Sequence, residues 1–253
     1  MNADGSLADA PLLFVFIDIS SLPHHRRFLE QTLRLRVIEN QFHPPHEHHG
    51  LVKYDAGGTI LSINLFAERK FRSEASDAVT LVCRTSETEL PETLTDVDGH
   101  HYELHRKPPV DPALVTEIVA VRLAVTDLAE SVRFYRDVLG LHPAGPEPEG
   151  YRFRTGSLDL VLCESTVDPE LVRYNACLLV FYTADCEAAE QALIRRGLRF
   201  RSTTGVSDIG ATTRFNDPSG HVFCLYQPSA ESLQWGSAEK VLDLMTGGAR
   251  IHH

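Results

Sequence analysis

The sequence lacks any apolar run approaching the roughly 20 residues that a membrane-spanning helix needs. It also lacks an excess of positive charge, because 24 Lys and Arg face 35 Asp and Glu, for a net charge of −11. Phosphate backbones and anionic membrane surfaces bind clustered cations, so neither a nucleic acid nor a membrane is an expected partner. Residues 1–6 contain no basic segment leading into an apolar one, so we expect no signal peptide.

Paired cysteines are absent as well. The odd set has no CxxC spacing and comprises Cys83, Cys163, Cys177, Cys186 and Cys224. Such a set is typical of reduced thiols, which predicts a cytoplasmic protein without disulfides. No glycine-rich phosphate loop and no recognisable Ser-His-Asp or Cys-His-Asn arrangement occurs, so the sequence does not indicate nucleotide binding or triad hydrolysis.

What the chain does contain is an internal repeat with a period of about one hundred residues. The segment 126–141 has a weaker counterpart beginning at Ser20, and Asp98-Gly-His echoes Ser219-Gly-His. A repeat of this length indicates two related domains. We predict domains at residues 11–106 and 117–228, a proline-rich linker between them, and a tail at 229–253 that contains a helix starting at Ser237.

The second repeat has the pattern β-α-β-β-β twice, with one helix beginning at the capping box Asp127-x-x-Glu130 and ending at Gly140. The first repeat follows the same plan, but residues 85–99 are too few for a helix and two further strands. One half of its sheet then lacks a helix. We expect the tail helix to cover this bare face or another one; the alternative is that it lies on its own domain.

Two segments of the second repeat, 121–141 and Phe215-Asn-Asp-Pro-Ser-Gly-His, resemble the vicinal oxygen chelate superfamily of glyoxalase I, extradiol dioxygenases and bleomycin-resistance proteins. The resemblance covers about 117–227 well and 12–106 weakly. It implies an α+β fold of two tandem βαβββ-repeat domains, the first abridged, followed by a C-terminal helix. In this superfamily each domain curls its sheet around a cavity.

The resemblance also locates the metal ligands of the family's metalloenzymes. Their places in the second repeat hold Ala120, Leu178 and Cys224, and two of those in the first repeat hold Phe14 and Glu103. One thiolate does not hold a divalent ion, so the usual triad is missing. This argues against an ordinary glyoxalase or extradiol dioxygenase, and leaves open whether the protein is an enzyme.

Strand alternation directs Ala120, Arg122 and Ala124 toward the cavity. The planar guanidinium of Arg122 suits a carboxylate, so we predict that it binds an anionic organic ligand; the alternative is an ion pair with an acidic residue such as Asp159. The same alternation adds further candidate ligand contacts, each with an alternative as a core residue, at Cys224, Tyr226 and Phe153.

A second constellation lies on one side of the last strand of the first repeat, where His101, Glu103 and His105 alternate. Neighbours on one face of a strand are about 7 Å apart, so two of them could share Zn, Mn or Fe with a ligand from another strand. The alternative is a solvated polar strand. The histidines of the segment 43–49 could also bind metal, but its prolines favour a solvated loop, and we expect His24 and His25 at the surface.

Two functions of different class follow. The first is a small-molecule-binding or -converting protein, metal-independent in its second domain and without a cofactor, with an anionic organic ligand at Arg122. The second is a metal-dependent lyase, isomerase or dioxygenase with an atypical site at Glu103, His101 and His105. In either case we expect a small organic ligand and a monomer or homodimer.

Overall fold

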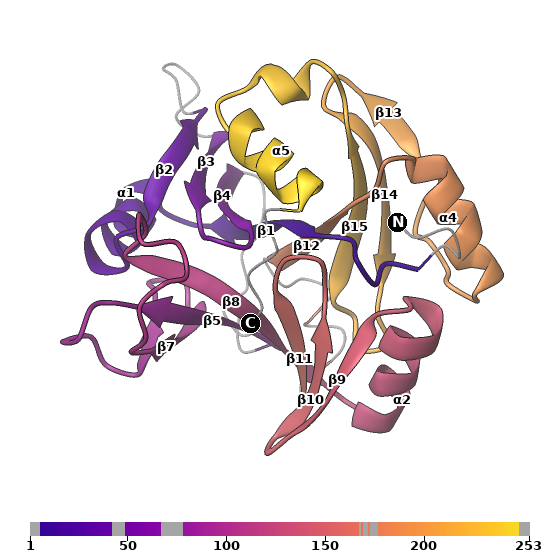
Figure 1. Ribbon diagram of the computed structural model, residues 1–253, viewed down its shortest axis with the longest axis horizontal. Coiled ribbons are helices and arrows are strands. Elements are labelled where there is room, and N and C mark those ends of the chain that lie inside the picture. Colours follow the sequence, from indigo (N-terminus) through magenta and orange to yellow (C-terminus); the bar gives the residue numbers. More distant parts are fainter. Residues whose placement is uncertain are drawn as a thin grey trace.

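The computed structural model describes residues 6–41, 49–66, 78–166, 168, 172 and 177–247. The chain forms four successive units, each beginning with a strand (Figure 1). The first contains β1 (Leu12–Ile19), α1 (Leu22–Arg27), β2 (Arg36–Asn40), β3 (His49–Asp55) and β4 (Ile60–Phe66). The second contains β5 (Val79–Thr85), β6 (Thr93–Thr95) and β7 (His101–His105).

The third unit contains β8 (Thr116–Val125), α2 (Leu128–Arg133), β9 (His142–Glu147), β10 (Gly150–Arg154) and β11 (Asp159–Glu164). The fourth contains β12 (Cys177–Tyr182), α4 (Cys186–Arg195), β13 (Gly205–Ser207), β14 (Gly210–Asn216) and β15 (Val222–Pro228), and α5 (Ala238–Thr246) follows it. The α+β class, the tandem repeat and the abridged second unit are as predicted, since the described residues between β5 and β7 form no helix.

The strands form two sheets, each of which takes one half from each repeat. The eight-stranded sheet has the order β13-β14-β15-β12-β1-β4-β3-β2, and the seven-stranded sheet has the order β6-β7-β5-β8-β11-β10-β9. The leading strands of the units make the joins, because β1 pairs antiparallel with β12, and β5 with β8. The expectation that each repeat curls its own sheet is therefore wrong; the residue boundaries of the two domains stay a prediction.

The helices of the two repeats share their local design. Asp127 caps α2 by accepting a hydrogen bond from the Glu130 amide at 2.8 Å, as the capping box predicts. Both α1 and α2 continue into a π-helical turn, over Phe28–Thr32 and Phe134–Val138. The second residue after each of these turns has a positive φ: Arg34 at 55° in the first repeat and Gly140 at 71° in the second.

One continuous core joins the two sheets. Alternate side chains enter it from strands of both sheets, for example Val121, Leu123 and Val125 from β8 and Val15 and Ile17 from β1. The opposite side chains of each sheet face away from this core and form two smaller clusters. In the seven-stranded sheet that cluster centres on Val82, Ala120 and Val161.

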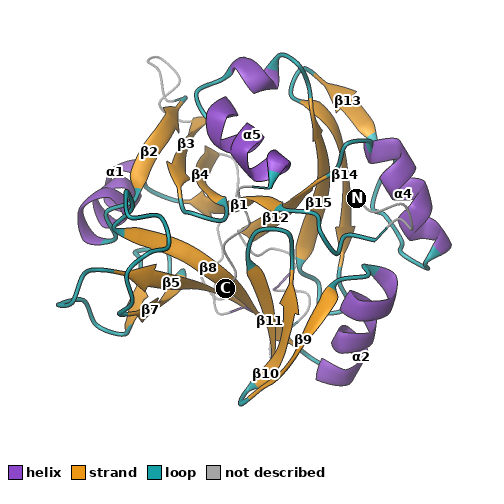
Figure 2. Ribbon diagram, in the orientation of Figure 1, coloured by secondary structure: helices purple, strands orange, loops and turns teal. Residues whose placement is uncertain are grey.

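The other small cluster lies on the eight-stranded sheet, beneath α5. Val241 and Leu244 of α5 pack there against Leu13, Phe14 and Cys224. Figure 2 shows α5 lying over this sheet. The tail helix thus covers a sheet face, as predicted, but that face belongs to the eight-stranded sheet and not to the abridged half. No helix in the described parts of the chain is long and apolar enough to cross a membrane.

Candidate functional site

Arg122 lies on β8, on the face of the seven-stranded sheet that points away from the main core. In register it lies between Thr80 on β5 and Val161 on β11. Its guanidinium reaches across β5 to the carboxylate of Glu103 on β7, with Nη2 2.9 Å from Oε2 and 3.1 Å from Oε1. Both side chains therefore lie on the face of the sheet that is opposite to the main core. The alternative prediction for Arg122, an ion pair with an acidic residue, is observed, with Glu103 as the partner and not Asp159.

Glu103 engages only one nitrogen of the guanidinium. The Nε atom of Arg122 is buried and has no hydrogen-bond partner. Its Nη1 lies 3.9 Å from Glu149, whose side chain is 82% exposed, which is beyond hydrogen-bond distance. Since a guanidinium carries five N–H donors, Arg122 keeps donor capacity beyond its contacts with Glu103 and Cys163 in the described part of the chain.

The rest of this face combines apolar and paired polar groups. Val82, Ala120 and Val161 form its apolar cluster, with Cys163 packed against it. Burial raises the pKa of the Cys163 thiol above its usual value, although the nearby Arg122 guanidinium opposes this effect. The thiol therefore stays protonated at neutral pH and is a poor nucleophile.

The second arginine of this face binds two carboxylates. Arg152 on β10 donates from Nε to Glu147 at 2.5 Å and from Nη1 to Asp159 at 2.7 Å. The hydrogen bond with Glu147 is the main reason why the pKa of Arg152 is raised, and the ion pair with Asp159 adds to it. Arg152 thus has carboxylates at two of its nitrogens, whereas Arg122 has a carboxylate within hydrogen-bond distance of only one.

The three predicted metal ligands on β7 share a face, but they do not form a compact set. Glu103 Oε1 lies 2.7 Å from His105 Nε2, whereas the His101 ring contacts Thr95 Oγ1 at 3.2 Å. Among the residues that the structure describes, the one group that brings three ligand atoms within 4.8 Å of one another is His25, Asp96 and His100. A metal role for His101, Glu103 and His105 remains a prediction.

The remaining predicted ligand contacts lie elsewhere. Cys224 and Tyr226 face the side of the eight-stranded sheet that α5 covers. Burial raises the pKa of Cys224 to about 12, and the Tyr226 hydroxyl donates to the carbonyl of Ile209 at 2.8 Å. Phe153 is fully buried in the main core, where its ring packs against Tyr135 at a centroid distance of 5.7 Å. The structure therefore does not bring these three residues to Arg122.

The five metal places of the superfamily that were assigned to residues above, all of them in the described part of the chain, do not fit an ion. Ala120, Phe14 and Leu178 have no donor atoms, and Cys224 and Glu103 lie in different sheets. The Glu103 carboxylate is held by Arg122 and His105. We therefore derive no chemical step through a metal at these places.

A buried polar cluster between α1 and the turn before β7 was not predicted from the sequence. His25 was expected at the surface but is fully buried, and it lies beside Asp96, Asp98 and His100 from the turn before β7. Burial alone would lower the pKa of His25, but its contacts with Asp96 and Ser21 raise it above the usual value. One sequence feature could have indicated this cluster. The segment Asp98-Gly-His carries a carboxylate where its counterpart in the second repeat, Ser219-Gly-His, has a serine. The histidines at 43–48 lie outside the described residues.

Comparison with known proteins agrees with this architecture. Residues 117–225 match the model of the Glyoxalase/Bleomycin resistance protein/Dioxygenase superfamily. No curated protein matches the sequence.

Solved structures resemble the whole chain. A putative dioxygenase from Bacillus subtilis has a TM-score of 0.67 at 11% identity, covering 98% of this chain and 92% of its own. Glyoxalase I from Zea mays has a TM-score of 0.62 at 13% identity, covering 96% of this chain and 97% of its own. At these identities the likeness extends to the fold alone. The match of residues 117–225 therefore relates the second repeat to the glyoxalase, bleomycin resistance protein and dioxygenase superfamily, and the whole chain shares the fold of these solved structures.

Proposed function

We propose that this protein binds, or assists the conversion of, a small organic carboxylate at Arg122, on the outward face of the seven-stranded sheet, without a metal ion at that face. The donors of Arg122 that Glu103 does not engage carry this proposal: among the residues that the structure describes, buried Nε has no hydrogen-bond partner, and Nη1 lies 3.9 Å from the exposed Glu149. A buried guanidinium donor without an acceptor is unfavourable, and a ligand oxygen would relieve it.

The other sheet supports the same choice of face. The corresponding side chains of the eight-stranded sheet are packed under α5, so a ligand there would have to displace a helix. On the seven-stranded sheet, the charged groups Arg122 and Glu103 stand next to the apolar cluster of Val82, Ala120 and Val161. An apolar patch beside a few polar groups suits an organic acid, because its hydrocarbon part and its carboxylate each find a partner.

The proposal includes the setting of the protein. All five cysteines are free thiols, which supports a reducing compartment such as the cytoplasm. The proposed partner is a small molecule, and the protein acts as a monomer or homodimer.

Binding of three small carboxylates, namely acetate, pyruvate and benzoate, tests this function by isothermal titration calorimetry. We expect the Arg122→Ala variant to weaken the binding of the best of the three by roughly 10–100-fold, because a hydrogen bond to a charged group contributes about 1.5–3 kcal/mol. Arg122→Lys keeps the charge but loses the fork, so its affinity should fall between the two. Glu149→Gln removes a competing anion and should strengthen binding slightly.

Two outcomes would contradict the proposal. One is that none of the three carboxylates binds, or that binding is unchanged in Arg122→Ala. The other is a stoichiometric metal ion that is present in the wild-type protein and lost selectively in Glu103→Ala. That result would favour the alternative, a metal-dependent lyase, isomerase or dioxygenase at Glu103, His101 and His105.

A further inference from the structure

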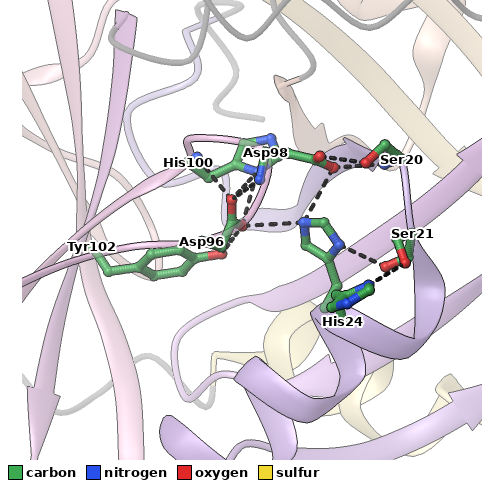
Figure 3. A network of polar contacts seen from close by, with 8 residues as sticks. Ser20, Ser21, His24, Asp96, Asp98, His100 and Tyr102 are labelled. Atoms are coloured by element: carbon green, nitrogen blue, oxygen red, sulfur yellow. Dashed lines mark hydrogen bonds and ion pairs between the residues drawn. The ribbon is translucent and has the colours of Figure 1, made fainter.

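Four ionisable side chains meet in the interior between α1 and the turn that precedes β7 (Figure 3). Three of them, His25, Asp96 and His100, offer ligand atoms that lie within 4.8 Å of one another. The exposed fractions of these side chains are 0%, 0% and 6%. Asp98 adds a second carboxylate, with Oδ2 3.3 Å from His25 Nε2. So many ionisable groups in the interior require an explanation, because unpaired buried charges are strongly unfavourable.

The second repeat shows what this junction needs for folding alone. There, a single hydrogen bond from Tyr135 Oη to Asp217 Oδ2, 2.8 Å long, ties the helix to the turn. His221 points away from this carboxylate and contacts the carbonyl of Ala124 at 2.8 Å. The helices align without gaps, and the first repeat has His25 in place of Ser131 and Leu29 in place of Tyr135. Asp217 and His221 correspond to Asp96 and His100, and Ser219 accepts the Thr126 amide as Asp98 accepts that of Ser20. The His25 imidazole and the second carboxylate, Asp98, therefore exceed what the fold requires.

The hydrogen bond at Nδ1 determines the tautomer of His25. Its Nδ1 lies 2.8 Å from the backbone carbonyl of Ser21, and a carbonyl only accepts, so Nδ1 carries the proton. In the neutral ring, Nε2 then directs its lone pair at two carboxylate oxygens, from Asp96 and Asp98. These three atoms repel one another unless a positive charge lies between them. That charge is either a second proton on the ring or a metal ion.

The distances around His25 favour the metal ion, whereas His100 Nδ1 lies at hydrogen-bond distance from Asp96 Oδ2, 2.9 Å, which leaves His100 Nε2 as the atom that can bind the ion. His25 Nε2 lies 3.4 Å from Asp96 Oδ2 and 3.3 Å from Asp98 Oδ2, and Nε2 makes no hydrogen bond. A protonated imidazole donating to a carboxylate would stand at about 2.7–2.9 Å. Tetrahedral Zn²⁺ with bonds of about 2.0–2.1 Å keeps its ligand atoms about 3.3–3.4 Å apart.

The surrounding groups hold the carboxylates in place. Oδ1 of Asp96 accepts the backbone amides of Asp98 and His100 at 3.0 and 2.9 Å, which leaves Oδ2 directed at the cluster. The Tyr102 hydroxyl donates to Oδ2 at 3.3 Å, and Asp98 accepts the Ser20 amide at 2.6 Å. Metal-binding residues are commonly oriented in this way, and a ligating His usually donates its other N–H to a carbonyl, as His25 does.

We propose that His25, Asp96 and His100 bind a divalent transition metal, with Zn²⁺ well suited to two imidazoles and a carboxylate, and with Asp98 as a second carboxylate beside His25. The ion joins α1 to the turn before β7 and takes the place of the Tyr135–Asp217 hydrogen bond of the second repeat. It has a structural role, because the cluster is buried. This site is separate from Arg122 and from the β7 set of His101, Glu103 and His105.

Metal analysis of the full-length protein tests the site. After EDTA treatment, reloading with Zn²⁺ and gel filtration, the wild-type protein should retain one equivalent of zinc. Zn²⁺ at a hundredfold excess over its Kd should raise Tm by roughly 5–10 °C. His25→Ser, which introduces the residue of the second repeat, should lose at least 90% of the bound zinc and the Tm shift. If His25→Ser does not fold, the variant His25→Ser/Leu29→Tyr/Asp98→Ser/Tyr102→Phe copies the junction of the second repeat and should fold without metal.

Two controls separate this site from other histidines. His24→Ala removes the neighbouring ring, which contacts Ser21 Oγ at 2.7 Å, and His46→Ala/His48→Ala removes two histidines of the 43–49 segment. Both should keep the zinc, as should Arg122→Ala, so failure of the carboxylate proposal leaves this one unaffected. A wild-type protein that retains less than a tenth of an equivalent, or a His25→Ser protein that retains as much zinc as the wild type, overturns the proposal.

Discussion

At the scale of single residues, strand alternation predicted that His101, Glu103 and His105 share one side of β7, and the structure agrees, because the direction of a side chain depends only on its own strand. The contact between Glu103 and Arg122 was not predicted. The same reasoning failed for His25. Its partners Asp96 and His100 lie more than 70 positions along the chain, and no local pattern reports that contact. The backbone at Arg34 was not predictable either. Arg34 has a positive φ, which normally favours glycine, and the second repeat has Gly140 at this position.

The burial of Phe153 leads to a residue-scale prediction. Phe153→Ala should lower the free energy of unfolding by about 3–5 kcal/mol, because it leaves a cavity beside Tyr135 and Tyr151. Urea denaturation measures this loss. Binding of the carboxylates by the remaining folded protein should be unchanged. Weakened binding at unaltered stability would instead return Phe153 to the ligand site.

At the scale of elements, the long strands and the helices were predicted and the short edge strands were not. β9 escaped detection because Pro143, Gly145 and Pro146 are poor strand formers, and such residues are accommodated at a sheet edge. β6 and β13 each have only three residues, too few to show an alternation. The tail helix was predicted from its sequence, but the face it covers depends on which strands pair.

The attachment of α5 predicts a dependence on acid. Lys53 Nζ lies 3.0 Å from Glu39 Oε1 and 3.0 Å from Ser237 Oγ, and Lys240 Nζ lies 3.0 Å from Asp55 Oδ1. Burial alone would raise the pKa of Glu39 and Asp55. Hydrogen bonds and the lysine charges nevertheless bring both pKa values below their usual range.

A carboxylate with a depressed pKa stabilises the fold above its unfolded pKa and loses this effect as the pH falls through the folded value. The free energy of unfolding should therefore fall as the pH drops below about 4. Fluorescence of the single tryptophan, Trp235, follows this region directly, because Lys53 Nζ lies 5.6 Å from its ring centroid. In Glu39→Gln/Lys53→Met the acid-induced loss should be smaller. An equal loss in that variant would assign the effect to other carboxylates.

At the scale of the whole molecule, the repeat revealed two related halves but not how they combine. Pairing β1 with β12, or β5 with β8, satisfies the same alternation as pairing within a repeat. Register and partner choice between apolar strands depend on contacts that are distant in sequence. The sequence therefore predicted the fold family and the strand faces, whereas it did not predict which half-sheets share a site.

The combination of strands from both repeats in each sheet predicts cooperative unfolding. Each sheet contains strands of both repeats, and one core joins them, so neither repeat can lose its structure alone. Calorimetry should show one transition with equal van't Hoff and calorimetric enthalpies. A fragment covering 107–253 should stay unfolded or associate, because β8 and β12 lack their partners. It should recover a native spectrum when mixed with the fragment 1–106. Two separate transitions, or a stable monomeric fragment, would contradict this expectation.

The order of strands has a consequence for biosynthesis. The seven-stranded sheet is continuous in sequence, from Val79 to Glu164, whereas the eight-stranded sheet takes its strands from the two ends of the chain. On a ribosome, the middle of the polypeptide can complete its sheet while β1 still waits for β12 to be made. The nascent chain must therefore shield one unpaired edge of β1, whose other edge pairs with β4, for most of its synthesis, and α5 can dock only after the last strand has emerged.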